Sequence, residues 1–257
     1  VYLADTLPAG VTVQISSSVG SSGQAPPVPS AGNVLWMHLD ENPAQNGAIL
    51  ARHSCVEVDG LFVTDNGATN RSVVGRFGQA VSFVDNDDDD HVIVTPTVAF
   101  GGQAASVGLW MKAVDGNETV LSYAVSGASD EFVVGIVGGI LTIRVDGSTL
   151  NTGVSFVSGN WRHVAVTWNG AAVSNNLTIY LDGVQAYQGT LSSGGTIAAG
   201  GVTVLGQYLG TVNGAFVGAD AFGGELDEVV LFNRVLTRCQ ALLLATQPGD
   251  CALLAGQ

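Results

Sequence analysis

Short apolar runs recur along most of the chain at intervals of about ten residues, and this rhythm constrains the fold more than any other feature. From residue 34 to about residue 236, runs rich in Val, Ile, Leu, Thr and aromatic residues alternate with Gly, Asn, Asp and Ser turns. Runs of this kind are typical of strands. The rhythm predicts an all-β sandwich. The clearest predicted strands are residues 34–39, 80–84, 91–95, 106–113, 132–137, 140–145, 161–168, 177–183 and 224–232.

Pairs of residues that tolerate a positive φ stand between several of these runs. They are Asp115-Gly116, Asp146-Gly147, Asn169-Gly170 and Asp182-Gly183. Because such pairs favour two-residue turns, we expect tight hairpins at these points.

Only residues 236–247, LTRCQALLLATQ, have a helical pattern. Thr237 is a favourable N-cap residue, and the apolar positions between residues 241 and 245 allow one face to dock. The sequence therefore predicts a β-sandwich with one short C-terminal helix.

The composition fits a large buried core, because 46% of the residues are hydrophobic and only 12% are charged. The chain has 22 acidic and 8 basic residues, a formal net charge of −14. A basic patch for nucleic acid or anionic membranes is therefore not expected. No apolar run approaches the roughly 20 residues needed to cross a bilayer, so membrane insertion is not expected. An acidic, lysine-poor composition favours an extracellular or cell-surface location.

The three cysteines are too few for a disulfide framework and lack the spacing of a zinc site. Cys239 and Cys251 enclose a short loop that a disulfide closes in an oxidising compartment. Cys55 is then left buried or unpaired. The sequence leaves two possibilities for Cys239 and Cys251: a disulfide between them, or two free thiols.

The N-terminal part divides from the rest at a Ser/Pro/Gly linker, residues 16–32. Residues 1–15 form an orphan strand segment in which Val11, Val13 and Ile15 alternate with polar residues. Its DTLPAGV string resembles the last strand of a repeated β-sandwich domain of large prokaryotic surface proteins. The resemblance implies a strand that pairs with the main domain or with an adjacent copy. Residues 33–247 are the main domain, and residues 248–257 are a C-terminal tail.

Five strings occur in one order along residues 34–247: LWMHLDE (35–41), GRFGQAVSFVDNDDDDHVIV (75–94), GNWRHVAVTWNG (159–170), LTIYLDGVQ (177–185) and FGGELDEVVLFNRVLT (222–237). This set resembles the concanavalin A-like jelly roll of the laminin G-like and pentraxin-type family. The resemblance implies a two-sheet antiparallel sandwich with sites on one concave sheet or on the rim loops. The Gly, Ser and Thr-rich segments 96–105, 148–158 and 190–201 are the loops in which we expect specificity.

Several chemistry-bearing residues of these strings have a structural interpretation. In residues 161–168 the alternation gives both faces bulk that must be covered, which indicates a central strand. We expect His163 to be a hydrogen-bonded structural histidine rather than a catalyst. Trp36, Trp110 and Trp161 are expected mainly in the core, although a tryptophan on the concave sheet is able to stack on a sugar.

Two candidate cation sites follow from the carboxylates. Asp85, Asp87, Asp89 and Asp90 belong to an acidic tract that either binds calcium or is a solvated turn. In pentraxins an acidic pair precedes the equivalent strand and corresponds to Asp89 and Asp90. The second half of that site is missing, because Tyr208, Leu209 and Gly210 stand where carboxylates are expected.

The second candidate is a structural calcium between Asp40 and Asp227, which relatives of the fold bind between their first and last strands. The alternative is that Asp227 and Glu228 pair with Arg234 or with backbone amides at strand ends.

Catalysis is not expected. The laminarinase-type glycoside hydrolases of this fold carry carboxylates that alternate along one concave strand. The nearest string, GELDEVV, has Glu225 and Asp227, but Val229 and Val230 follow where the next carboxylate is required. No GxSxG, HExxH or P-loop motif occurs.

We interpret the chain as a non-catalytic extracellular adhesion or recognition module that binds a glycan or protein partner, with calcium as the one implied cofactor. The alternative is a structural subunit of a filament, sheath or surface layer that self-associates through its N-terminal strand.

Overall fold

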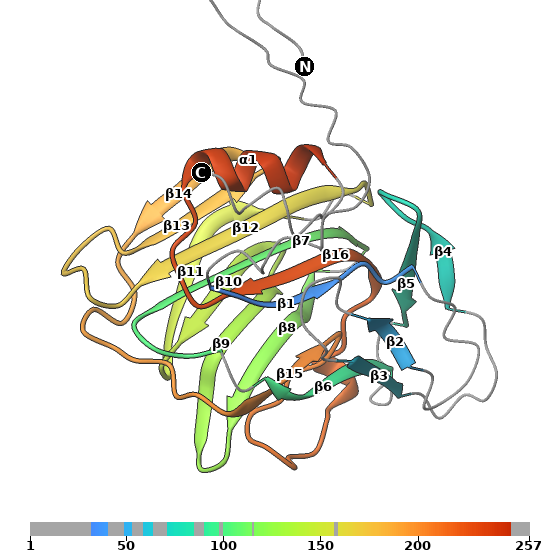
Figure 1. The fold of residues 1–257 in the computed structure, drawn as a ribbon, viewed down its shortest axis with the longest axis horizontal. Helices are drawn as coiled ribbons and strands as arrows, with labels where there is room; N and C mark the ends of the chain where they lie inside the picture. The colour runs from blue at the N-terminus through green and yellow to red at the C-terminus, as the bar shows by residue number, and fades with distance from the viewer. Residues whose placement is uncertain are drawn as a thin grey trace, which may run out of the picture.

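The computed structural model describes residues 32–40, 49–52, 59–63, 71–84, 90–97, 100–114, 116–156 and 159–247. In this part of the chain, two eight-stranded antiparallel sheets form a sandwich with one α-helix (Figure 1). The predicted all-β, two-sheet antiparallel jelly-roll sandwich, concanavalin A-like, with a short C-terminal helix is confirmed. No helix in these ranges is long and apolar enough to span a membrane.

One sheet, here called sheet A, has the strand order β14-β13-β12-β7-β16-β5-β4, and β1 also pairs with β16. Its strands are β1 (Asn33–Met37), β4 (Ser72–Val74), β5 (Gln79–Phe83), β7 (Ala104–Ala113), β12 (Arg162–Asn169), β13 (Leu177–Leu181), β14 (Val184–Gly189) and β16 (Gly224–Phe232).

The other sheet, sheet B, has the order β11-β10-β9-β8-β15-β6-β3-β2. Its strands are β2 (Ile49–Arg52), β3 (Asp59–Val63), β6 (His91–Thr97), β8 (Asn117–Val125), β9 (Ala128–Val137), β10 (Ile140–Val145), β11 (Ser148–Ser155) and β15 (Gly201–Leu205).

The core lies between the sheets and follows from period-two alternation in the strands. In β10, Leu141, Ile143 and Val145 are fully buried in the core, whereas Thr142 and Arg144 point away from it. Each such strand therefore has an outer face that the core does not use.

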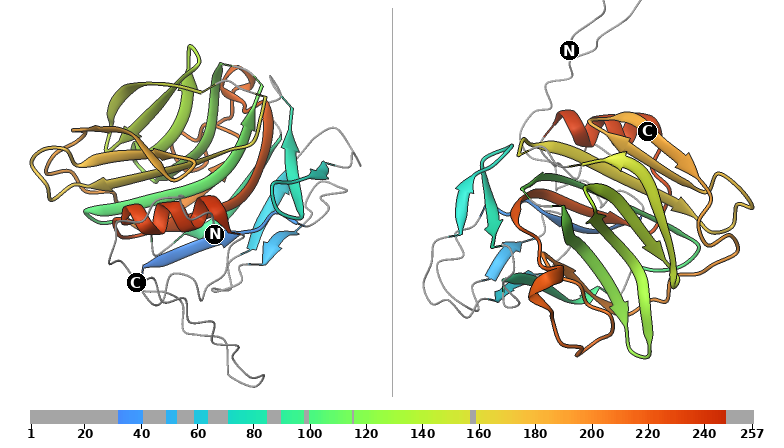
Figure 2. Two further views of the ribbon diagram at one scale, coloured as in Figure 1. Left: turned by 90° about the horizontal axis from the view of Figure 1, so that it is seen from above. Right: turned by 180° about the vertical axis from the view of Figure 1, so that it is seen from behind.

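Helix α1 (Arg238–Thr246) covers part of the outer face of sheet A (Figure 2). Thr237 caps it through a capping box with Gln240, which satisfies free N–H groups of the first turn. Ala241 packs against Ala165 and Tyr180 of the sheet below. The predicted helix over residues 236–247 is confirmed.

Two of the predicted hairpin turns have the expected backbone. Asp146-Gly147 and Asp182-Gly183 have positive φ at both residues. Asn169-Gly170 was a wrong prediction, because it opens a longer connection that runs to Asn176. Gly170 is needed there for close approach, since a Cβ would lie 2.5 Å from the Trp168 ring. Asp115 lies outside the described residues.

The predicted loop over residues 148–158 is also wrong, because Ser148–Ser155 forms β11. This strand lies at the edge of sheet B and alternates half-buried with exposed polar residues. An edge strand buries little apolar surface, so its sequence lacks the alternation by which inner strands are recognised.

Candidate functional site

The outer face of sheet B carries cross-strand rows of side chains that turn away from the core. One row joins Ser122 of β8, Val133 of β9 and Arg144 of β10. The next joins Thr119, Gly135 and Thr142 on the same three strands. Because side chains that face each other across antiparallel strands lie about 5 Å apart, these rows form one continuous outer layer, in which Ser122 is fully buried.

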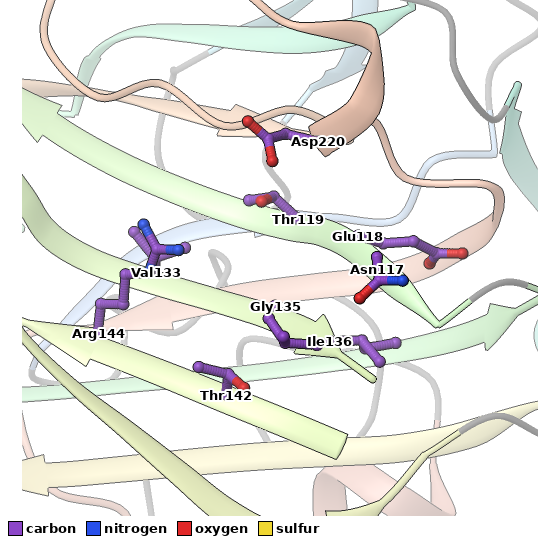
Figure 3. Close-up of a pocket in the computed structure, with 10 residues that line it drawn as sticks. Asn117, Glu118, Thr119, Val133, Gly135, Ile136, Thr142, Arg144 and Asp220 are labelled. Atoms are coloured by element: carbon purple, nitrogen blue, oxygen red, sulfur yellow. The ribbon is translucent and has the colours of Figure 1, made fainter. Parts of the chain in front are cut away.

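A pocket of about 190 Å³ opens on this surface (Figure 3). Figure 3 shows Asp220, from the short 3-10 helix η1 (Gly218–Asp220), on one side of Thr119 and Gly135 and Thr142 on the other side. Six of the ten lining residues are polar or charged, which gives a hydroxyl-rich ligand hydrogen-bonding partners. It consists of Asn117, Glu118, Thr119, Val133, Gly135, Ile136, Val137, Thr142, Arg144 and Asp220.

Gly135 leaves the middle of the pocket floor without a side chain. A Cβ at this position would lie 2.9 Å from the carbonyl oxygen of Glu118. The register of β8 against β9 shifts between Thr119 and Leu121, which indicates a bulge beside this glycine. Any larger residue at position 135 therefore clashes with β8 and fills the pocket.

Arg144 is held in place at one end of the pocket. Its guanidinium donates to Asp130 at 3.1 Å and lies 5.1 Å from the centre of the Tyr208 ring. The Tyr208 hydroxyl donates to the same Asp130 oxygen at 2.7 Å. Burial and the nearby Asp130 carboxylate raise the pKa of Tyr208, so this hydroxyl keeps its proton at neutral pH. Asp130 and Tyr208 thus hold Arg144, the member of this group that lines the pocket, in a fixed position.

Tyr208 belongs to a segment, residues 207–221, that we call the strap. Its ends are joined by a hydrogen bond from Phe222 N to Gly206 O, and its Leu209 N donates to the Ser122 hydroxyl. The strap crosses the outer face of sheet B and encloses a second, mainly apolar pocket of about 170 Å³ beside Phe216. That pocket is lined by Ile93, Thr95, Val202, Leu209, Val212, Asn213, Gly214 and Phe216.

The structure brings Asp40 and Asp227 to the same turn, as the sequence predicted for a pair between the first and last strands. Both carboxylates accept backbone amides of the β4–β5 turn: Asp40 from Gln79 N at 2.7 Å, and Asp227 from Phe77 N at 2.9 Å. These donors occupy oxygens that a cation would need.

The side chains around that turn do not fit a calcium site well. The described residues contain no group of three or more His, Cys, Asp or Glu side chains that is able to hold a metal ion. The observed arrangement is the alternative one, in which backbone amides at a strand end donate to one oxygen of each carboxylate. Calcium between Asp40 and Asp227 therefore stays an untested prediction.

Asp227 is fully buried, and its second oxygen, Oδ1, has no hydrogen-bond partner among the described residues. Desolvation raises the pKa of Asp227 from 3.8 to about 7, and the carboxylates of Glu228 and Asp40 add to this, while the amide of Phe77 opposes it. Asp227 faces Trp110 across β16 and β7, and Trp110 faces His163 across β7 and β12.

His163 is a buried structural residue, with 1% of its surface exposed. Burial lowers its pKa to about 3, so the imidazole is neutral at ordinary pH. Its ring packs edge-on against Trp110, with 5.5 Å between the ring centres. Its Nδ1 has no hydrogen-bond partner in the described ranges, so the expected ring hydrogen bond to a neighbouring element is not seen there.

The hydrogen-bond partners of Glu228 are Trp36 and His38 on the outer side of sheet A, whereas the predicted alternative was Arg234. A bulge in β16 between Asp227 and Val230 gives Glu228 a positive φ of 51°. Its carboxylate accepts from Trp36 Nε1 at 3.1 Å and lies 2.9 Å from His38 Nδ1. This hydrogen bond raises the pKa of His38.

Asp90 lies buried at the end of the acidic tract and has a structural role. It pairs with Arg71 at 2.8 Å and accepts from Val84 N at 3.3 Å, which ties the ends of β5 and β6 together. Asp85, Asp87 and Asp89 lie outside the described residues, so a cation site in the tract stays a prediction.

The predicted disulfide and the predicted assembly strand also lie partly or wholly outside the described residues. Cys239 is exposed on α1, whereas Cys251 lies outside the described residues, and the disulfide between them is untested. Val11, Val13 and Ile15 of the predicted assembly strand also lie outside them.

The string that most resembles a hydrolase motif is engaged in other contacts. Glu225 pairs with Lys112 at 2.9 Å, and Asp227 is bound to the β4–β5 turn. In the described contacts of the string GELDEVV, both Glu225 and Asp227 are therefore already bound, and no pair of free carboxylates is seen there.

Sequence reasoning missed the pocket residues Arg144, Glu118, Asp220 and Thr142, and Asp130, the partner of Arg144. One signal was available for Arg144, because it is one of only 8 basic residues and interrupts the apolar run ILTIRV at an outward position. A lone charge in an otherwise apolar strand indicates a partner on the outer face of the sheet.

Residues 86–241 match the sequence model of the concanavalin A-like lectin/glucanases superfamily. Human neuronal pentraxin-1 is 33% identical over 147 residues, which is 56% of this chain and 34% of that protein. The chain thus spans about a third of the length of this relative.

Two solved structures share the fold. The heptameric SAP-like pentraxin from Limulus polyphemus has a TM-score of 0.55 and 23% identity, covering 64% of this chain and 80% of that one. The second is domain 4 of AbnA, an extracellular arabinanase from Geobacillus stearothermophilus, which was solved in complex with arabinotriose. It has a TM-score of 0.59 and 17% identity, and the match covers 84% of this chain and 100% of that one.

Proposed function

Because the chain belongs to the concanavalin A-like lectin/glucanases superfamily, we propose that it is a non-catalytic extracellular module that binds a glycan in the polar pocket on sheet B. The arabinotriose complex of AbnA domain 4 supports a glycan as ligand, because it shows the same fold in a carbohydrate complex. The acidic, lysine-poor composition supports the extracellular location.

The fixed position of Arg144 at one end of the pocket is the observation that carries the proposal. Asp130, Tyr208 and Arg144 hold one another through two hydrogen bonds and a ring contact, so their positions do not depend on a ligand. A site whose groups are held in advance loses less conformational entropy on binding. The side-chain-free floor at Gly135 leaves room for a ring to lie against the sheet.

A glycan array with the wild-type chain and two arginine variants tests the proposal. Arg144→Ala removes one side of the pocket. Arg162→Ala is a matched control on sheet A, because Arg162 also pairs with an aspartate and is similarly exposed, at 36% against 32% for Arg144. We expect Arg144→Ala to lose most of the binding, by about tenfold or more, and Arg162→Ala to keep it.

Equal binding by both variants would place the ligand elsewhere on the molecule. The array is run with calcium and with a chelator, because calcium bound by the acidic tract remains part of the proposal. Release of new reducing ends from any bound glycan contradicts a non-catalytic module.

A further inference from the structure

We propose that the polar pocket selects glycans that carry free amino groups over the same glycans in acetylated or acidic form. This inference rests on the proposed function and specifies its ligand class. It follows from how the charges around the pocket are already paired.

Arg144, the one basic side chain that lines the pocket, is neutralised before a ligand arrives. Its guanidinium is bound to Asp130 at 3.1 Å and packs on the Tyr208 ring. Because Tyr208 also donates to Asp130, a ligand carboxylate has to compete with a hydrogen-bonded ion pair for this cation. An acidic sugar is therefore poorly matched to this end of the pocket.

The exposed carboxylate of Asp220, on the other side of the pocket, creates a negative surplus. Asp220 is exposed, and no hydrogen bond or ion pair of its carboxylate is found among the described residues. Glu118 lies on β8 below it and is 4% exposed. Arg144 and Asp130 already neutralise each other, so the exposed Asp220 leaves the pocket with one unpaired negative charge, and Figure 3 shows Asp220 and Glu118 on the β8 side.

The rest of the molecule adds to this field instead of cancelling it. The chain has a net charge of −14, and four of its basic side chains are paired with carboxylates. These pairs are Arg71–Asp90, Lys112–Glu225, Arg144–Asp130 and Arg162–Asp182. A negative field of this kind attracts a cationic ligand and repels an acidic one.

The expected preference is moderate, because Asp220 is exposed to solvent. Exposed charge pairs are weak, so we expect an amino sugar oligomer to bind about fivefold more tightly than its acetylated form through Asp220 alone. The preference is expected to decrease at high ionic strength, since salt screens exposed charges.

The test uses glucosamine oligomers and N-acetylglucosamine oligomers of equal length, measured by calorimetry at low and high salt. The variants are Asp220→Asn, which removes the pocket carboxylate, and Asp146→Asn as matched control. Asp146 is also an exposed aspartate of this part of the chain, lies outside the pocket lining, and has a positive φ that asparagine tolerates. An oligolysine of equal charge measures attraction to net charge alone.

We expect the amino oligomer to bind more tightly than the acetylated one, with the preference reduced about fivefold by Asp220→Asn and kept by Asp146→Asn. Three results overturn the inference: equal or tighter binding of the acetylated oligomer, equal losses in the two variants, or oligolysine binding as tight as that of the amino oligomer. Arg144-dependent binding of only neutral or acidic glycans also overturns it but leaves the proposed function intact. No Arg144-dependent binding of any glycan refutes the proposed function itself.

Discussion

The substitution Asp227→Asn is expected to remove a large pH dependence of stability between pH 4 and pH 8. Asp227 is fully buried, and its pKa rises from 3.8 in the unfolded chain to about 7 in the folded one because the carboxylate is desolvated. The folded state then binds the proton more tightly than the unfolded state. The stabilisation from this group is complete below about pH 4 and is lost as the pH rises through about 7.

The magnitude follows from the two pKa values. Each pH unit between them corresponds to about 1.4 kcal/mol, so the interval from 3.8 to about 7 corresponds to a loss of about 4 kcal/mol. Asparagine keeps an oxygen for the amide of Phe77 but does not titrate. Relative to wild type, the variant is therefore expected to gain about 4 kcal/mol of unfolding free energy between pH 4 and pH 8.

The assay is urea unfolding of wild type, Asp227→Asn and the exposed control Asp146→Asn at pH steps from 4 to 8, with a chelator present. A difference between wild type and Asp227→Asn that does not change with pH refutes the reasoning. Repeating the series with calcium tests the predicted cation site, because a cation bound to Asp227 keeps its carboxylate ionised and removes the pH dependence.

Three further predictions concern the helix, a turn and the N-terminal segment. Thr237→Ala removes one half of the capping box and is expected to cost about 1 kcal/mol in chemical unfolding, whereas Thr237→Ser restores the cap. Gly183→Ala is expected to destabilise the folded chain by more than about 1 kcal/mol, because φ at this position is +77° and the new Cβ lies 2.9 Å from the Leu242 backbone. An unchanged melting temperature of this variant would contradict the geometry. Light scattering of the full chain and of the chain without residues 1–31 tests assembly. If the full chain forms polymers and the truncated chain is a monomer, the strand-addition alternative is supported. If both chains are monomers, that alternative is excluded.

The inner strands were predictable because each carries its own alternation. The predicted bounds of β10 and β16, residues 140–145 and 224–232, agree with the structure. The edge strand β11 was missed because its residues are mainly polar and bury little surface.

The site was harder to predict than the fold, because its members lie on three strands and on the strap, with one or two polar residues from each. The resemblance to the family did suggest that Asp40 lies near Asp227, because relatives bind a cation between their first and last strands. It did not reveal that the amides of the β4–β5 turn bind both carboxylates, since backbone donors leave no trace in a sequence. The bulge that turns Glu228 toward Trp36 was not predicted for a similar reason, because it also leaves no trace in the sequence.

The floor of the polar pocket comes from one continuous stretch of chain. Strands β8, β9 and β10 follow one another through short turns at residues 126–127 and 138–139, and together they span Asn117–Val145. Apart from Gly135, where a larger residue clashes with β8, substitutions at the outward positions of this stretch leave the inward core residues untouched. Ligand preference is thus free to diverge between related chains while the sandwich stays the same, and a combinatorial library confined to these outward positions is a direct route to new specificities.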